Sequence, residues 1–228
     1  MRKQYKNLIK VAKKSLVLVF IFMLMVAFQV WAADNTDFSQ SIAAGTQNVL
    51  IVDAGGTEVG SPGVTFPEES YNFDNQDATG QLAPSAQRIR VYNPTSDDVW
   101  SVTIAASDPA DTWTTGSSDY DFNDAGGYAD DGATTDADSY GGQMTIDPST
   151  NGTITAVSPC ASTTNVSKGT SDSFVQTSNN SIDILSGASG SSTFCRWDYT
   201  SSAANITQKI PAAQAAGSYT LTMSLTIT

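Results

Sequence analysis

After residue 33 the chain alternates apolar and polar residues in short stretches, and no helical repeat there is longer than two turns. These stretches are rich in β-branched residues and are bounded by Gly, Pro, Asn, Asp and Ser, which favour turns. The alternation is clearest near the C-terminus, where apolar side chains occupy every second position from Tyr219 to Ile227. The pattern predicts strands over residues 47–52, 63–66, 88–92, 99–105, 143–146, 153–157, 173–176, 181–185, 193–199, 206–210 and 218–228.

Many short strands separated by turn signals favour an all-β fold, an antiparallel β-sandwich of the jelly-roll-like type. We expect one such domain over residues 33–228. Its core should contain two strand tryptophans and the apolar face of the last strand: Trp100, Trp197, Tyr219, Leu221, Met223, Leu225 and Ile227. The last strand has no charged residue to guard its edge, so by itself it would be prone to pair with another strand.

One long segment, about residues 106–142, breaks the strand pattern. Between Asp108 and Asp138 it carries nine acidic residues and no Lys or Arg, with Gly and Ser filling much of the rest. We expect this segment to be a long acidic loop inserted in the sandwich.

The N-terminal residues 1–32 have the layout of a secretory signal peptide. Six of the 11 basic residues lie before Ser15, an uncharged apolar run follows, and small residues end it at Ala32 and Ala33. This order of basic, apolar and small residues is typical of a cleaved export signal. An uncleaved membrane anchor is the alternative, because the run is about as long as a short membrane span. We favour cleavage, and therefore a secreted, extracellular protein.

The charge of the chain after residue 33 limits its partners. That part keeps five Lys and Arg residues against all 23 acidic residues, so its net charge is −18. Such a surface repels nucleic acid and anionic membranes and attracts cations. We therefore expect no nucleic-acid partner, and membrane contact only through the N-terminal segment if that segment is kept.

The two cysteines and the absence of histidine bear on chemistry. Cys160 and Cys195 form an even pair in an exported chain, which predicts a disulfide closing a loop of about 35 residues. Without histidine there is no Ser-His-Asp or Cys-His nucleophile, and two cysteines cannot build a Cys₄ metal site. We expect no enzyme and no required cofactor.

Calcium is the one cofactor that the sequence suggests. Asp119, Asp121 and Asn123 place oxygen side chains at alternate positions, as at the start of a calcium loop. Further oxygen ligands would come from the acidic residues that follow: Asp124, Asp130 and Asp131. The motif differs from an EF-hand, since it lacks the turn glycine and the closing Glu. A solvated acidic loop that keeps the protein soluble is the alternative.

Trp113 lies beside the acidic segment, between two threonines. An aromatic ring in a loop can serve as a stacking platform for a sugar, and it can equally anchor the loop by packing. The sequence leaves both roles open.

The order of segments resembles two groups of bacterial surface proteins. Residues 89–94 run into Trp100-Ser101-Val102, and the chain closes with Ile210-Pro-Ala and a strand after Gly217. This resembles WxL-type cell-surface domains of Gram-positive bacteria, and the resemblance implies a β-rich domain held non-covalently on the cell wall. The stretch from Phe38 to Thr46, ahead of the first strand, also resembles the TasA/camelysin group of exported fibre subunits.

Together these features predict a non-catalytic structural or adhesive protein of the bacterial cell surface or extracellular matrix, which self-assembles as a fibre subunit in one version. Its partners would be copies of itself or other surface proteins. The alternative is a surface module that binds carbohydrate or peptidoglycan, with cell-wall glycan as its partner and with Trp113 and residues 119–138 forming the site.

Overall fold

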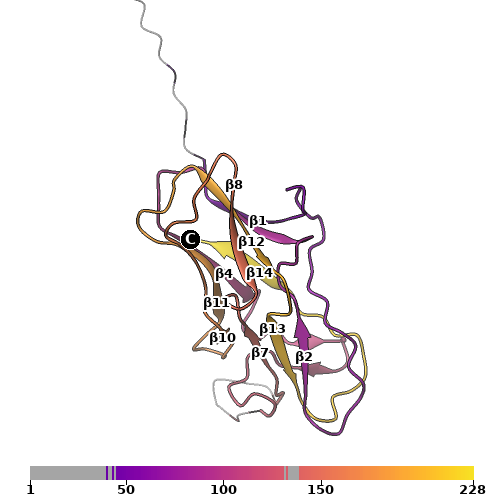
Figure 1. Ribbon diagram of the computed structural model, residues 1–228. Coiled ribbons are helices and arrows are strands. Elements are labelled where there is room, and N and C mark those ends of the chain that lie inside the picture. The colour runs from indigo at the N-terminus through magenta and orange to yellow at the C-terminus, as the bar shows by residue number, and fades with distance from the viewer. Residues whose placement is uncertain (1–39, 41–42, 44, 131, 133–138) are drawn as a thin grey trace, which may run out of the picture. The chain divides into compact units, whose positions relative to one another are not determined.

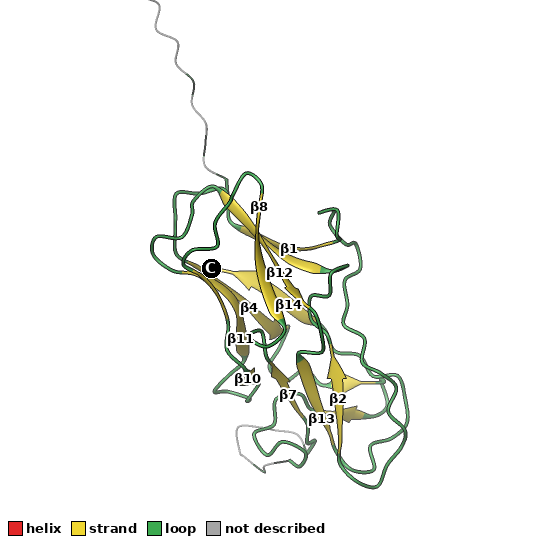
Figure 2. Cartoon of the chain, in the orientation of Figure 1, coloured by secondary structure: helices red, strands yellow, loops and turns green. Residues whose placement is uncertain are grey.

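The computed structural model describes residues 40, 43, 45–130, 132 and 139–228 (Figure 1). Every regular element among them is a β-strand, and every strand pair is antiparallel; Figure 2 accordingly shows only strands and loops. The predicted all-β antiparallel fold is confirmed. The predicted signal peptide, residues 1–32, lies outside the described residues. None of the described elements is a helix able to span a membrane.

The strands form three four-stranded sheets and one short ribbon. Sheet I has the order β1 (Asn48–Val52), β3 (Arg88–Asn93), β12 (Cys195–Ser201), β8 (Gly152–Val157). Sheet II has the order β10 (Asp172–Ser173), β7 (Gln143–Ile146), β13 (Ile206–Ile210), β2 (Gln76–Gly80). Sheet III has the order β14 (Met223–Ile227), β4 (Trp100–Ala106), β11 (Ser181–Gly187), β9 (Val166–Lys168). The ribbon pairs β5 (Trp113–Thr114) with β6 (Asp119–Tyr120).

The core of this β-sandwich-like fold is shared by the sheets. Trp197 of sheet I and Trp100 of sheet III are both buried, and their ring centroids lie 5.3 Å apart. Leu221, Leu225 and the other aliphatic residues of the C-terminal segment pack against this core but are only half-buried. Tyr219 lies beyond them and packs edge-to-face on Tyr120, with ring centroids 4.9 Å apart.

Three of the predicted strands differ from the structure by more than two residues. Of the predicted strand 173–176 only Ser173 is part of a strand, β10. Residues 63–66 form no strand and pair with no described strand. Pro62 and Pro67 flank them, and proline has no N–H to donate to a ladder. The C-terminal strand is shorter than the predicted 218–228, because β14 begins at Met223; before it only Thr220 makes an isolated bridge, to Thr114.

Strand β2 was not predicted, because its sequence Gln-Asp-Ala-Thr-Gly lacks large apolar residues. It forms because β13 offers a free edge along its whole length. The 62–67 segment then crosses directly over β2. A Cβ atom on Gly80 would lie 2.8 Å from Val64 and 2.9 Å from Phe66, so glycine there permits the close approach.

The predicted acidic loop, residues 106–142, is in part ordered β-structure. Ala106 still belongs to β4, and the β5–β6 ribbon lies within the segment. Phe122 is 1% exposed and packs edge-to-face on Phe174, with centroids 5.3 Å apart. The sequence alternates aromatic residues with the acidic ones here, and burial of the aromatic rings draws the first half of the segment into the fold.

The predicted disulfide is present and joins Cys160 to Cys195. Cys195 is the first residue of β12, and Cys160 lies three residues beyond the end of β8. The bridge therefore ties the loop after β8 to the strand that β8 pairs with.

Candidate functional site

Three of the predicted calcium ligands lie in a buried stretch directly after β6. Asp121, Asn123 and Asp124 are each at most 1% exposed. Oδ1 of Asp121 accepts hydrogen bonds from the backbone N–H groups of Phe122 (2.6 Å) and Asn123 (3.2 Å). Oδ1 of Asp124 accepts one from the N–H of Gly126 at 2.5 Å. These carboxylates thus hold the turns of their own segment.

The other proposed ligands are arranged differently. The Asn123 amide donates to the carbonyl of Pro109 at 2.9 Å, while its Oδ1 is buried and accepts no hydrogen bond from the described residues. Asp130 is exposed and accepts from the N–H of Gly132 at 2.8 Å. Asp131 lies outside the described residues. Within the described part of the chain, no three Asp, Glu or Cys side chains converge as metal ligands. Calcium binding therefore stays a prediction.

Trp113 stands in a row of aromatic rings. Its ring lies 5.5 Å from that of Phe66, edge to face, and 6.0 Å from that of Tyr120, nearly parallel at 12°. Its indole N–H donates to Oε1 of Gln208 at 2.9 Å, and Gln208 is 1% exposed. Burial raises the pKa of the Tyr120 hydroxyl above its usual range. The sequence left two roles open for Trp113, an anchor for the loop and a stacking platform for a sugar. The ring is packed, and it also lines two cavities.

The first cavity is an apolar groove of about 620 Å³ between the edges of β1 and β14. Val49 and Ile51 of β1 line it on one side, and Leu221, Met223 and Leu225 line it on the other. These side chains are half-buried, although all are aliphatic or thioether groups that the core would normally cover. The groove is therefore an opening of the core at the place where two sheet edges meet.

The second cavity is a cleft of about 690 Å³ on the other side of Phe66 and Trp113. It lies between the 62–67 segment with the loop that follows it, the strands β2 and β13, the β5–β6 ribbon and residues 214–219. Polar groups make up more of its lining than of the groove's lining, and carboxylate, amide and hydroxyl groups lie beside its aromatic rings.

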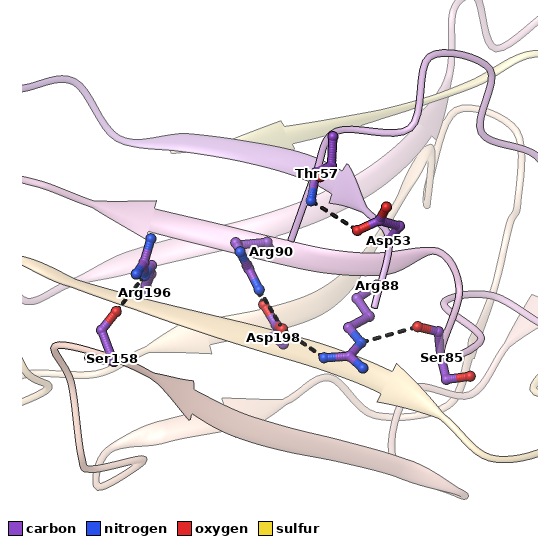
Figure 3. A network of polar contacts seen from close by, with 8 residues as sticks. All are labelled: Asp53, Thr57, Ser85, Arg88, Arg90, Ser158, Arg196 and Asp198. Atoms are coloured by element: carbon purple, nitrogen blue, oxygen red, sulfur yellow. Dashed lines mark hydrogen bonds and ion pairs between the residues drawn. The ribbon is translucent and has the colours of Figure 1, made fainter. Parts of the chain in front are cut away.

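The three arginines of the described chain lie on strands of sheet I, Arg88 and Arg90 on β3 and Arg196 on β12 (Figure 3). Nε and Nη2 of Arg90 donate to the two oxygens of Asp198 at 2.5 and 2.8 Å, and both residues are buried. Arg88 donates to the same carboxylate at 3.4 Å. The bond to Asp198 raises the pKa of Arg90 further. Arg90 can be buried because two of its N–H donors meet both oxygens of one carboxylate.

Several residues of these cavities gave no signal in the sequence. Gln208 and Gln214 come from separate segments, and each orients an aromatic side chain: Gln214 donates to the hydroxyl of Tyr219 at 2.7 Å, as Gln208 accepts from Trp113. Glu68 follows Pro67 in a loop. Its only signal in the sequence is that glutamate is rare, since it occurs in just two stretches of the chain. Their assembly depends on the fold.

Comparison of the chain with protein-family models, with curated proteins and with solved structures gives no match. Its function is therefore inferred from the geometry described above.

Proposed function

We propose that this protein is a secreted, non-catalytic structural or adhesive component of the bacterial cell surface or extracellular matrix, built on a jelly-roll-like sandwich. Its copies associate in series, with a strand of one copy added to the free edge of β14 in the next copy, which makes the protein a fibre subunit. The resemblance of the sequence to exported fibre subunits and to WxL-type surface domains supports the same proposal.

The observation that carries the proposal is the open edge beside the apolar groove. In the described part of the chain β14 pairs with β4 alone, so its other side has no strand partner. The strand contains no charged residue and no proline, which are the usual means of blocking an edge. A strand added at this edge would cover the half-buried Met223 and Leu225 and pair with β14 at once.

The register of β14 shows which backbone groups are free. Ser101 and Thr228 exchange both backbone hydrogen bonds, at 2.8 and 3.0 Å. In an antiparallel pair the hydrogen-bonded positions alternate. Residues 224 and 226 therefore bond to β4, whereas the N–H and C=O groups of Met223, Leu225 and Ile227 face the free edge.

A proline at position 225 tests the proposal. Leu225→Pro removes an N–H from the free edge without removing a bond to β4, and Leu225→Ala is the matched control, because it shortens the side chain but keeps the N–H. We expect the wild-type chain and Leu225→Ala to form multimers in sedimentation velocity and fibres in negative-stain microscopy. Leu225→Pro should stay monomeric while its circular dichroism spectrum remains that of a β-sheet protein.

Two results would overturn the proposal. One is a wild-type protein that is monomeric under all conditions and is not retained on fractionated cells. The other is a Leu225→Pro variant that assembles as well as Leu225→Ala does.

A further inference from the structure

The polar cleft of about 690 Å³ differs in chemistry from every other surface described above. Its volume lies within the range of about 300–1,000 Å³ that is usual for small-molecule sites. Four separate parts of the chain form its walls. They supply polar and aromatic side chains, among them Glu68, Glu69, Tyr71, Gln76, Tyr120 and Tyr219.

The aromatic walls of the cleft are fixed before any ligand arrives. Tyr120 stacks on Trp113 and meets Tyr219 edge to face. The hydroxyl of Tyr219 accepts from the amide of Gln214 and donates to the carbonyl of Ala215, both at 2.7 Å. A wall that is already ordered loses little conformational entropy when a ligand binds, so the wall formed by Tyr120 and Tyr219 is preorganised.

Tyr71 provides the accessible aromatic surface at the cleft. It is 53% exposed and lines the cleft, and its ring meets that of Phe73 edge to face at 5.2 Å. Trp113, by contrast, is covered by Tyr120 on one face. The stacking platform that the sequence suggested at Trp113 is therefore better provided by Tyr71.

The hydrogen-bonding groups of the cleft are available to a ligand. The side chains of Glu68, Glu69 and Gln76 line it and make no hydrogen bond to other described residues. Two carboxylates and an amide offer several acceptors and two donors, a set that matches neighbouring hydroxyl groups, since a carboxylate accepts strong O–H bonds.

The negative charge of the cleft disfavours anionic ligands. The described lining contains no Lys or Arg, and Glu68 and Glu69 make it acidic in a chain that is already strongly negative. Phosphates, uronic acids and other anions are repelled. An aliphatic ligand would suit the neighbouring groove better, because that cavity is lined mainly by Val, Leu, Ile and Met. A neutral, hydroxyl-rich ligand with an apolar C–H face fits both the aromatic and the polar walls.

We propose that this cleft binds a neutral oligosaccharide, with a sugar ring against Tyr71 and its hydroxyls held by Glu68, Glu69 and Gln76. The binding is separate from the proposed assembly, since none of these residues belongs to β14. Failure of one proposal leaves the other standing.

Calorimetric titration of the purified full chain tests the site with defined probes: cellohexaose, mannohexaose and hexa-N-acetylchitohexaose as neutral sugars, hexagalacturonate as an anionic sugar, and trilysine as a cation. At least one neutral hexasaccharide should bind saturably with a stoichiometry of one, and hexagalacturonate should not. Tyr71→Ala should weaken that binding about tenfold, the order of an aromatic contact. Glu68→Gln with Glu69→Gln should weaken it further.

Matched controls are Phe194→Ala, an exposed aromatic residue that does not line the cleft, and Glu58→Gln, which lines the apolar groove instead. Both should bind as the wild type does. The proposal is overturned if no neutral hexasaccharide binds at millimolar concentration, if Tyr71→Ala and the double Glu variant bind as well as the controls, or if trilysine alone binds in the cleft. The last result would mark it as a site for basic peptides.

Discussion

Strands β12 and β14 lie in different sheets and differ in how many strands they pair with. β12 pairs with β3 on one side and β8 on the other, whereas β14 pairs only with β4 among the described strands. In β12 three successive residues, Trp197, Asp198 and Tyr199, are buried, so both faces of the strand are covered. In β14 each apolar residue is half-buried and each residue between them is exposed.

The polar face of β12 is covered because its carboxylate has a dedicated partner. Asp198 lies between Arg88 and Arg90, and the turn after β1 closes over Arg90. Gly56 in that turn has φ +88°, and a Cβ atom there would lie 2.5 Å from Nη1 of Arg90. Buried and paired groups are therefore concentrated around β12, whereas the backbone groups on the outer side of β14 pair with no described strand and its aliphatic side chains are half-buried.

The largest expected effect separates these two regions directly. Trp197→Ala should lower the free energy of unfolding by about 4 kcal/mol, because it leaves a large cavity in the core. Leu225→Ala should lower it by only about 1–2 kcal/mol, since Leu225 is half-buried and loses less apolar contact. Urea denaturation of both variants measures the difference. Equal losses of unfolding free energy in the two variants would contradict the difference between β12 and β14.

The second largest effect should come from removal of the disulfide, which lies at the start of β12. A bridge across 35 residues contributes about 3–4 kcal/mol when it limits the unfolded chain. Reduction of the wild-type protein should therefore lower its Tm by several degrees, and the variant with both Cys160→Ser and Cys195→Ser should show no response to the reductant. Thiol titration of the unreduced, denatured protein should find none, and two free thiols per chain would refute the bridge.

Asp198→Ala should follow, with a loss of about 3 kcal/mol, because it leaves the buried guanidinium of Arg90 without its carboxylate. Asp183→Ala is the matched control, since Asp183 is an exposed acid on β11 whose loss should cost less than about 0.5 kcal/mol. Thermal and urea unfolding give both values. A similarly small loss of unfolding free energy in both variants would mean that the Arg90–Asp198 pair does not stabilise the region around β12.

A further prediction concerns the effect of calcium on the stability of the buried acidic stretch after β6. If it binds calcium, a hundredfold excess over Kd should raise the free energy of unfolding by about 2.7 kcal/mol. Asp119→Asn should abolish this gain. Asp121→Ala should also lower stability without calcium, because Asp121 holds two backbone amides of its own segment.

The measurement for calcium is calorimetric titration against magnesium and sodium at equal ionic strength. Saturation near one or two ions per chain supports the site, because a net charge of −18 attracts cations diffusely in any case. No saturable heat at millimolar calcium would end the metal hypothesis.

The smallest effect concerns a turn between β7 and β8. Hydrogen bonds from Ser149 and Thr150 lower the pKa of Asp147 to about 2. A lowered pKa in the folded state stabilises the fold at pH values above the ordinary pKa of about 3.9. That contribution should disappear as the pH falls from about 4 to about 2. The stability difference between wild type and Asp147→Asn should be constant from pH 7 to 5 and shrink below pH 4, as urea titrations at each pH would show. A constant difference down to pH 2 would contradict it.

Much of the fold could be predicted from the sequence because a strand's period of two is local. Residues 143–146 and 206–210 are strands with the predicted bounds, and most of the other predicted strands shift by one or two residues. The disulfide was predictable for a simpler reason: a chain with two cysteines has only one possible intramolecular pairing.

The sequence by itself determined which side chains alternate between an apolar and a polar face, and that the chain contains no histidine. Only the tertiary structure decided which edges stay open, since that depends on how many neighbours each strand finds. It also made β2 a strand against its composition and left residues 63–66 unpaired. The ion pair of Arg90 and the polar cleft likewise join residues more than 40 positions apart. Local periodicity does not encode such partners, because the free energy of burial is shared by segments that meet only when the whole chain folds.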